Sequence, residues 1–509
     1  MSETWQTLLT LGDKLSAHVL LSAAALALGI AVALPLAVWA GRSRSVARVT
    51  LGLASLVQTI PALALLALFF PILLSLRAVF GSGVPTLGFL PALLALALYA
   101  LLPILRNAVT ARAEMDPGVL EAADAVGMTP AQKLRLVEAP LAAPFVMAGI
   151  RTAAVWTIGA ATLSTTVGQP SLGDPIFAGL QTQNWALVLA GCIAAATLAL
   201  VTDGLLALIE RGLGTRRPAL AWLGLGLVAA GLFAAAFAGQ RESRDTVVVG
   251  AKNFSEQYIL ARLIGQRLER AGYAVTYREG LGSAVIHRAL TSGQIDVYVD
   301  YSGTVWANEM KRTDTPDRAA MLKGIAAWEQ GNGARLLGSL GFENAYAFAM
   351  KSDRAKAMGI ASLADLAAKG RDLTLGGDLE FFRRPEWRRV DAAYGLGALR
   401  QRNFAPTFMY DALASGEAEA ITAFSSDGRI AADKLAVLAD PKGALPAYDA
   451  ILLVAPARAN DARLVNALKP LVGAIPVAAM QQANYRVDRP DDKQSPEAAA
   501  RWLAQRIGR

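Results

Sequence analysis

The chain has 509 residues, of which 54% are hydrophobic and 18% are charged, and it carries a net charge of +8. The chain has a single cysteine, Cys192, which excludes an internal disulfide and a CxxC metal site. Its two histidines, His18 and His287, leave almost no material for a histidine-based metal site or catalytic triad. No basic run is interleaved with aromatic residues, so the positive charge does not indicate a nucleic-acid partner.

Six apolar segments precede residue 240, and each is long enough to cross a membrane, which takes about 20 mostly apolar residues. They lie near 17–40, 50–75, 88–110, 144–167, 185–208 and 218–238. The first 18 residues lack the basic region of a cleavable signal peptide, so we expect the first segment to stay in the chain. Beyond about residue 240, charged residues are spread throughout, as in a soluble α/β domain.

Basic residues mark the connections on one side of these segments. They are Arg42, Arg44 and Arg48 after the first segment, Arg106, Arg112, Lys133 and Arg135 after the third, and Arg211, Arg216 and Arg217 after the fifth. The opposite connections hold Arg77 alone or no basic residue. By the positive-inside rule the basic side is cytoplasmic, which places everything after the sixth segment outside the cytoplasm.

One carboxylate, Asp203, lies within the fifth segment, where a charged side chain is a candidate for function. Asp203 is near the cytoplasmic end of the segment and close to Glu210 and Arg211. We therefore interpret it as a side chain that reaches the membrane interface, and we do not place it in a functional site.

A short polar stretch on the cytoplasmic side, residues 117–140, interrupts the apolar sequence. An apolar helix face runs from Val119 to Val126, and Gly127 is suited to end this helix because glycine tolerates the left-handed conformation. Pro130 then begins a second helical stretch. Such a helix–glycine–helix elbow can dock a partner, although the pattern alone fits an amphipathic loop on the lipid surface equally well.

The spacing of this stretch is Glu-Ala-Ala, three residues, Gly, nine residues, Val-x-Ala-Pro, and it resembles the EAA loop of bacterial ABC-importer permeases. The resemblance implies an ATPase-coupling loop made of Glu121, Ala122, Ala123 and Gly127, whose short helix inserts into a groove of an ABC ATPase subunit. Ala139 stands where the family usually has leucine. The chain contains no G-x-x-x-x-G-K-[ST] phosphate loop, so we expect ATP and Mg²⁺ on a separate partner chain and no cofactor on this one.

From Thr246 onward, strand and helix patterns alternate. Strands are expected at 246–254, 273–280 and 295–303, with helices at 255–272 and 283–293 between them. This βαβαβ order predicts a parallel sheet, and ligands of such sheets lie at the carboxyl ends of the strands.

An internal repeat favours two similar lobes. Residues 289–304 (ALTSGQIDVYVDYSGT) align without gaps with residues 412–427 (ALASGEAEAITAFSSD), which pairs Tyr301 with Phe424. Two such lobes facing each other would enclose a cleft with aromatic side chains on both sides. Chance similarity in an alanine-rich sequence, and an ordinary aromatic core, are the alternatives.

Five stretches, GAKNFSEQYIL, DVYVDYSGT, GFENAYAFAM, DLEFFRRPEW and ALPAYDAILL, resemble the binding proteins of osmoprotectant ABC importers, which take up glycine betaine, choline, carnitine and related compounds. The resemblance covers residues 246–509. The implied fold class is an α-helical polytopic membrane domain of the ABC-importer permease fold, with about six spans, plus an α/β two-lobed domain like a periplasmic binding protein. The implied domains are a transmembrane permease domain at 1–217, a sixth span and tether at 218–244, and an extracytoplasmic substrate-binding domain at 245–509.

The resemblance also assigns a ligand site residue by residue. It implies an aromatic cage of Tyr301, Tyr346, Phe424 and Tyr448, a carboxylate-binding Arg384, and flanking residues Thr304, Lys252 and Asn253. Aromatic faces attract the diffuse charge of a quaternary ammonium, and a planar guanidinium binds a carboxylate through two parallel hydrogen bonds. Whether Arg383 or Arg384 faces the ligand is left open.

Three departures from the family weaken choline as the solute. Phe424 stands where the family often has tyrosine, Arg383 lies beside Arg384, and residues 280–290 contain no acidic side chain. A larger betaine, such as the histidine betaine ergothioneine, is therefore kept as an alternative.

We expect a fused permease and solute receptor that spans the lipid bilayer of the bacterial inner membrane, forms a homodimer and binds an ABC ATPase subunit and a small betaine-type ligand. No nucleic-acid partner, catalytic residue or metal site is expected. The alternative class is a membrane-anchored chemosensory receptor for quaternary ammonium compounds, which would need no EAA elbow and would carry a cytoplasmic signalling domain. A surface enzyme is a third class, for which the sequence offers no catalytic constellation.

Overall fold

The computed structural model describes residues 2–80, 84–182, 184–215, 217–238, 245–314, 316–378, 381–405, 408–489 and 491–508. They form two compact units. The first comprises Met1–Phe177 and Trp185–Glu242, and the second comprises Ala178–Asn184 and Ser243–Arg509. Arg216, the tether residues 239–244 and the side chain of Arg77, which entered the predictions above, lie outside the described residues.

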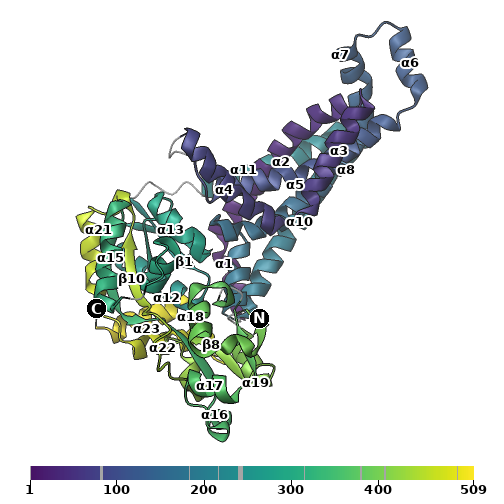
Figure 1. Ribbon diagram of the computed structural model, residues 1–509. Helices are drawn as coiled ribbons and strands as arrows, with labels where there is room; N and C mark the ends of the chain where they lie inside the picture. Colours follow the sequence, from purple (N-terminus) through teal and green to yellow (C-terminus); the bar gives the residue numbers. More distant parts are fainter. Residues whose placement is uncertain are drawn as a thin grey trace. The chain divides into compact units, whose positions relative to one another are not determined.

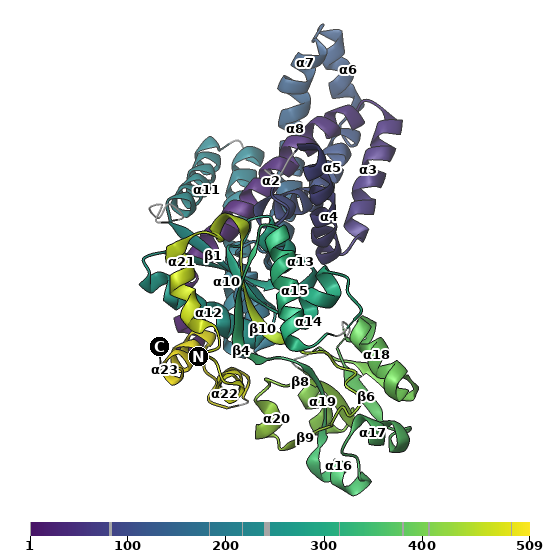
Figure 2. The ribbon, with the colours of Figure 1, turned by 60° about the vertical axis from the view of Figure 1, so that its left-hand side comes forward.

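The first unit is a bundle of apolar helices (Figures 1 and 2). Its helices include α1 (Ser2–Thr10), α2 (Gly12–Ala40), α5 (Phe89–Ala113), α8 (Ala139–Ala161), α10 (Trp185–Gly214) and α11 (Pro218–Ala238). Helix α9 (Gly173–Gln181) begins in this unit, and its residues from Ala178 onward belong to the second unit. Helices α2, α5 and α8 pack closely because small residues line their contacts. A Cβ atom on Gly29, for example, would lie only 2.9 Å from the Cβ atom of Ala100. The polytopic helical membrane domain is therefore confirmed.

The second predicted span is broken. Within the described residues, five helical stretches are long and apolar enough to cross a membrane, and the number is six if α3 (Arg44–Thr59) and α4 (Ala62–Phe80) count as one bent span. These two helices meet at 102°. Pro61 causes the break, because a proline forces the preceding residue out of the helical region, and Ile60 accordingly has an extended backbone with φ −74° and ψ 124°.

The polar stretch before α8 forms two short helices that project from one end of the bundle (Figure 1). They are α6 (Pro117–Ala125) and α7 (Pro130–Lys133), and a π-helical turn, Leu134–Glu138, joins α7 directly to α8. The helix of the fourth span therefore begins at Pro130, well before the predicted start of the span at 144. The π-helical turn lies just before Pro140, which has no N–H for the regular helical hydrogen-bond pattern.

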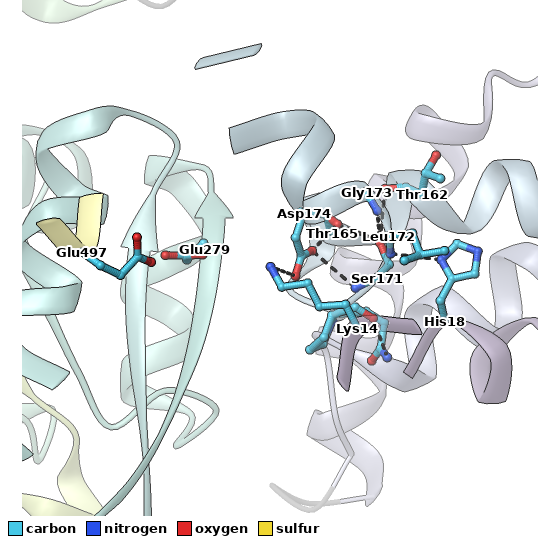
Figure 3. A network of polar contacts seen from close by, with 12 residues as sticks. Lys14, His18, Thr162, Thr165, Ser171, Leu172, Gly173, Asp174, Glu279 and Glu497 are labelled. Carbon is cyan, nitrogen blue, oxygen red and sulfur yellow. Dashed lines mark hydrogen bonds and ion pairs between the residues drawn. The ribbon is translucent and has the colours of Figure 1, made fainter. Parts of the chain in front are cut away.

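A buried polar network fixes the turn that follows α8 (Figure 3). Nδ1 of His18, on α2, accepts the backbone N–H of Leu172 at 3.2 Å, so Nε2 carries the proton and donates to a backbone carbonyl of α8 at 3.0 Å. Asp174 accepts the hydroxyl of Thr165 at 2.6 Å and pairs with Lys14 at 3.1 Å. The network thereby holds this end of α8 against α2. The charge pattern predicts that this end lies on the non-cytoplasmic side.

Asp203 has a partner that the sequence did not suggest. Two atoms of the Arg151 guanidinium donate to its two carboxylate oxygens, at 2.9 and 2.7 Å, and a third donates to Glu210 at 2.5 Å. Our interpretation of Asp203 as a side chain reaching the interface beside Arg211 omitted this pair, because Arg151 lies on α8, 52 positions away in sequence. The ion pairs connect α8 to α10.

The second unit contains two five-stranded sheets, with the strand orders β2-β1-β3-β10-β4 and β7-β6-β8-β5-β9. The strands are β1 (Thr246–Lys252), β2 (Ala274–Leu281), β3 (Val297–Tyr301), β4 (Arg335–Glu343), β5 (Tyr346–Lys351), β6 (Thr374–Gly377), β7 (Arg400–Asn403), β8 (Ala420–Phe424), β9 (Leu435–Val437) and β10 (Asp449–Val454). Strand β1 is parallel to β2 and β3, as the βαβαβ pattern predicts, and β10 joins the first sheet antiparallel to β3. The α/β two-lobed fold is confirmed.

Each sheet has its own helices (Figure 2). The first lobe has α12 (Ser255–Arg270), α13 (Ser283–Thr291), α14 (Ser302–Thr304), α15 (Arg318–Gly331), α21 (Ala462–Leu468), α22 (Val477–Asp488) and α23 (Pro496–Arg506). The second lobe has α16 (Ser352–Met358), α17 (Leu363–Lys369), α18 (Pro385–Tyr394), α19 (Met409–Ser415) and α20 (Arg429–Ala432). The two repeats of the sequence form α13–β3 in one lobe and α19–β8 in the other. Each contains a glycine with a left-handed backbone between helix and strand, Gly293 at φ +73° and Gly416 at φ +83°.

Among the residues that the structure describes, the chain crosses between the lobes twice. The first crossing, Asn344–Ala345, joins β4 to β5, and the second, residues 438–448, joins β9 to β10. The backbone N–H of Asn344 donates to the carbonyl of Tyr448 at 2.9 Å, which ties the two crossings together. Two residues of the predicted cage lie at these crossings: Tyr346 directly follows the first crossing, and Tyr448 is the last residue of the second.

Candidate functional site

A cavity of about 310 Å³ lies between the two lobes of the second unit. All eight residues that the sequence assigned to the ligand site line it: Lys252, Asn253, Tyr301, Thr304, Tyr346, Arg384, Phe424 and Tyr448. They meet there because most of them follow or end strands whose ends converge on the cavity. Their role in ligand binding stays a prediction.

The aromatic side chains form a continuous wall. The ring centre of Tyr346 lies 5.0 Å from that of Phe424 and 5.7 Å from that of Tyr448, the latter pair in an edge-to-face arrangement at 89°. Phe254, which the sequence analysis did not select, lies 6.2 Å from Tyr301 and 6.5 Å from Phe424 and connects the aromatic residues of the two lobes. Its position next to Asn253 was the available signal.

Arg384, and not Arg383, faces the cavity. Arg384 is buried and lines the cavity, whereas Arg383 is exposed. The Arg384 guanidinium lies 5.6 Å from the Tyr346 ring centre, donates from Nη2 to the Tyr448 hydroxyl at 3.3 Å, and donates from Nε to Glu386 at 3.2 Å. The guanidinium is thus held in one direction by the cage and by a buried carboxylate.

Glu386 balances part of the charge of Arg384. Burial acts to raise the pKa of Glu386, but the Arg384 charge and hydrogen bonds from Tyr448 and Arg384 outweigh it and hold that pKa below its usual range. The Tyr448 hydroxyl donates to Glu386, and burial raises the pKa of Tyr448 far above that of a free tyrosine. A ligand carboxylate would therefore meet a preoriented guanidinium that it shares with Glu386.

Lys252 lies beneath the Tyr301 wall. Its Nζ is 2.5 Å from Asp300 and 5.3 Å from the centre of the Tyr301 ring, and both Lys252 and Asp300 are buried. Because its charge is paired inside the first lobe, Lys252 contributes a neutralised ion pair and not an isolated positive charge. Thr304, on α14, follows Tyr301 by three residues and is also buried at the cavity.

Four carboxylates that the sequence analysis did not assign to the site also line the cavity: Glu256, Asp378, Asp427 and Asp488. Each has a donor within the described residues. Asp378 accepts the backbone N–H of Phe381 at 2.6 Å, and Asp427 pairs with Arg429 at 2.8 Å. Residues 280–290, where an acid would be expected for choline, contain none, and the acids of the cavity come instead from α12, from the segments after β6 and β8, and from the end of α22.

Part of the cavity lining combines charged and aromatic side chains. The Arg429 guanidinium lies 3.9 Å from the Tyr410 ring centre, and Ser255 donates to Asp488 at 2.5 Å. Burial raises the pKa of Asp488 to about 6, although the neighbouring Arg429 opposes this shift. Asp427 is the last residue of the second repeat, 412–427, and Arg429 lies two residues beyond it, so the repeat was the available signal for both residues.

The polar elbow is a second candidate site, in the first unit. Gly127 has a left-handed backbone with φ +76°, and the N–H of Met128 donates back to the carbonyl of Ala123 at 3.1 Å. Helix α6 therefore ends at Gly127, as the sequence predicts. A salt bridge of 2.6 Å between Asp124 and Lys133 then fixes α6 against α7.

The surface of the elbow is open. Glu121, Ala122 and Gly127 are exposed, and Ala123 is buried. Val126, which is 72% exposed, and Leu136, which is 62% exposed, give it apolar contact area. Arg112, near the end of α5, pairs with Glu138 at 3.1 Å and holds the elbow to the bundle.

Comparison with known families assigns both units. Residues 245–505 match the substrate binding domain of ABC-type glycine betaine transport systems, and residues 25–215 match the inner membrane component of binding-protein-dependent transport systems. The ergothioneine transport permease/ergothioneine binding protein EgtU of Helicobacter pylori is 29% identical over 469 residues, which cover 88% of this chain and 82% of that protein.

Two further relatives match one unit each. The choline transport system permease protein OpuBB of Bacillus subtilis is 42% identical over 196 residues, 38% of this chain and 85% of that protein. A crystal structure of a glycine betaine/carnitine/choline ABC transporter is 26% identical and covers 52% of this chain and 98% of its own, with a TM-score of 0.45. The chain belongs to the ABC importers of the glycine betaine type, as a multi-pass transport subunit that joins the inner-membrane permease component to its substrate-binding domain.

Proposed function

We propose that the second unit captures a betaine-type quaternary ammonium solute in its cavity and that the first unit imports it, using ATP hydrolysed with Mg²⁺ by a separate ABC ATPase subunit. The observation that carries the proposal is the meeting of Tyr301, Tyr346, Phe424 and Tyr448 with Arg384 at one cavity between two lobes. Aromatic faces attract a cation that cannot donate hydrogen bonds, and a fixed guanidinium recognises the carboxylate of the same molecule.

The solute class that fits is glycine betaine, carnitine, choline or an ergothioneine-like betaine. Arg384 favours a solute with a carboxylate over choline. Arg429 and Asp427, which also line the cavity, offer charged partners for a larger polar group of the solute, and this favours carnitine or ergothioneine over glycine betaine. The similarity to the Helicobacter pylori protein, whose name states ergothioneine transport and binding, supports the same direction.

The elbow supports the coupling half of the proposal. A helix pair fixed internally by the Asp124–Lys133 salt bridge and tied to the bundle by Arg112 can transmit a displacement to α8 without folding over. Its exposed Val126 and Leu136, together with the exposed Glu121, suit a groove on a partner protein. We further propose that two copies of the chain form the pore-containing dimer and that each receives one ATPase.

Localisation is part of the proposal. The basic residues beside the elbow favour a cytoplasmic elbow. The first unit then spans the inner membrane, and the second unit lies outside the cytoplasm. Protease added to spheroplasts should cleave the second unit and spare the elbow. Protection of the second unit in right-side-out preparations would overturn this topology.

The experiment that tests the proposal measures uptake of radiolabelled glycine betaine, carnitine, choline and ergothioneine in cells that express the chain with or without its ATPase subunit. Import predicts accumulation of at least one solute only when the ATPase is present. If the chain is instead a chemosensory receptor, it should bind the solute without accumulation, whether or not the cells express the ATPase subunit. The elbow disfavours that alternative because a receptor does not require it.

A further inference from the structure

Glu256 is a buried carboxylate that borders the cavity without belonging to the aromatic cage. Only 3% of its surface is exposed, and it lies in the first turn of α12, directly after Ser255. Helix N-termini favour negative charge, and the position therefore suits an ionised side chain. Burial raises the pKa of Glu256, while hydrogen bonds from Ser426, Tyr301, Asn484 and Asn344 oppose this shift.

The donors to Glu256 come from separate parts of the second unit. The Tyr301 hydroxyl donates to Oε1 at 2.6 Å, and Nδ2 of Asn344 donates to the same oxygen at 3.0 Å. Nδ2 of Asn484 donates to Oε2 at 2.9 Å. These residues are a wall of the cage, the first crossing between the lobes, and α22. One carboxylate therefore contacts both the predicted ligand wall and the hinge.

Helix α22 extends this network to the second lobe. Asn484 donates to the carbonyl of Ser426 at 2.9 Å as well as to Glu256, and Gln481 donates to the carbonyl of Ser425 at 2.9 Å. Ser425 and Ser426 directly follow Phe424, the cage residue of the second lobe. The Ser425 hydroxyl also accepts the N–H of Ala345, in the first crossing, at 2.9 Å. The angle between the lobes and the positions of the cage residues thus depend on one set of hydrogen bonds.

The two lobes fix their repeated aromatic residues differently. Tyr301 is held by its hydroxyl, which donates to Glu256 and accepts from Gln257 at 3.0 Å. Phe424 has no hydroxyl and is held by ring contacts with Tyr346 and Phe254. Loss of Glu256 would therefore release the wall of the first lobe, and the hinge contact of Asn344, together.

We propose that Glu256 is a positioning residue for solute binding: it fixes the Tyr301 ring and couples that ring to the hinge, so that the four aromatic walls close around the ammonium group at one defined angle. The inference rests on the proposed binding function. It assigns to Glu256 no contact with the solute, and its effect on affinity passes through Tyr301 and Asn344.

The test uses the full-length protein in lipid nanodiscs and calorimetric titration with glycine betaine, carnitine and ergothioneine, each beside its N,N-dimethyl analogue. The variants are Glu256→Gln, Tyr301→Phe and the double variant. The matched control is Glu329→Gln, which changes another fully buried glutamate of the first lobe, bonded to His287 at 2.8 Å and absent from the cavity wall.

We expect Glu256→Gln to weaken binding of the trimethylated solute about ten-fold or more, because a buried hydrogen-bond network loses an acceptor. The double variant should be little weaker than Glu256→Gln alone, since both changes break one interaction. The preference for the trimethylated over the dimethylated solute should fall in Glu256→Gln and stay unchanged in Glu329→Gln. A purely structural role would weaken both solutes equally.

The inference is overturned if the Glu256→Gln protein binds the solutes as tightly as the unmodified protein, or if the effects of the two substitutions are additive. Either result leaves the proposed binding function standing. Should Glu256→Gln not fold, Tyr301→Phe alone decides, because it removes only the hydroxyl: weaker binding supports the inference and unchanged binding overturns it. An unmodified protein that binds none of the three solutes would overturn the proposed function itself, and this inference with it.

Discussion

Tyr301 and Phe424 occupy equivalent positions in the two lobes, each as the last residue of the middle strand of its sheet, and both rings border the same cavity. Each strand follows a helix and a left-handed glycine, so the repeat of the sequence is a repeat of structure. The two rings differ in support, one being held by hydrogen bonds and the other by ring packing. The cage is therefore approximately symmetric in position and asymmetric in chemistry.

The ring at Phe424 should act through its π face. Phe424→Leu keeps most of the apolar volume but removes the face, and we expect it to weaken binding of a betaine by about 1 kcal/mol, roughly five-fold. Phe424→Tyr should bind nearly as well as the unmodified protein. Calorimetric titration compares them, and equal affinities for the leucine and tyrosine variants would show that the ring serves only as apolar packing.

Loss of a whole wall should cost more. Tyr301→Ala and Tyr448→Ala each remove one aromatic face, and each should weaken binding by about 1–2 kcal/mol from the lost cation–π contact alone. Tyr448→Ala also removes the hydroxyl that contacts Arg384, so it should be the more severe for a solute with a carboxylate. The same titration checks this order, and two silent alanine variants would identify these aromatics as core.

The guanidinium of Arg384 should distinguish solutes by their carboxylate. Arg384→Ala should weaken betaine binding by about 2–5 kcal/mol, because a desolvated carboxylate loses its partner, and Arg384→Lys should not restore it. Choline, which has no carboxylate, should bind Arg384→Ala about as well as it binds the unmodified protein. The matched control is the exposed Arg383→Ala. A loss of betaine binding in that control, with none in Arg384→Ala, would move the carboxylate site to Arg383.

The elbow should separate transport from binding. Gly127→Pro cannot adopt the φ of +76° that ends α6, and Glu121→Lys reverses an exposed charge on the proposed docking surface. Both should abolish uptake while calorimetric binding by the same proteins is retained. Uptake at the unmodified rate in both variants would remove the coupling role of the elbow.

Asp488 should make the stability of the second unit depend on pH. Its pKa is raised by burial from 3.8 to about 6, so the folded state binds this proton more tightly than the unfolded state does. Above about pH 6, ionisation of Asp488 therefore lowers the free energy of unfolding by an amount of order 3 kcal/mol. This loss of stability disappears as the pH falls toward 4. Arg429, Asp427 and Lys493 also act on this carboxyl and are left in place by the test.

Asp488→Asn removes that titration. The stability of the unmodified protein relative to this variant should therefore rise as the pH is lowered from 7.5 to 5. Thermal unfolding followed at both values measures the difference. A difference in Tm that is the same at pH 5 and pH 7.5 would contradict the assignment of the raised pKa to Asp488.

Local patterns predicted most of what positions the site. The βαβαβ segment, the repeat around Tyr301 and Phe424, and the left-handed Gly127 depend on residues close together in sequence, and each has the expected structure. The break before Pro61 also depends on a local signal, the proline itself. The apolar composition of residues 50–75 nevertheless predicted one continuous span.

Long-range partners were not predictable from one sequence. Asn484 bonds to Glu256 across 228 positions, and Arg151 bonds to Asp203 across 52, and nothing in either local pattern specifies the other residue. The sequence likewise could not show which of Arg383 and Arg384 faces the cavity. Two identical neighbouring side chains differ only in the direction in which the backbone points them.

The measurement that tests the central claim most directly is calorimetric titration of the full-length protein and of its Tyr448→Ala, Arg384→Ala double variant with glycine betaine, carnitine, choline and ergothioneine. The account predicts saturable binding of at least one solute that carries both a trimethylammonium group and a carboxylate, with one site per chain, and loss of that binding in the double variant. Binding of none of the four, or binding that the double variant retains, would contradict the assignment of this cavity as a betaine site.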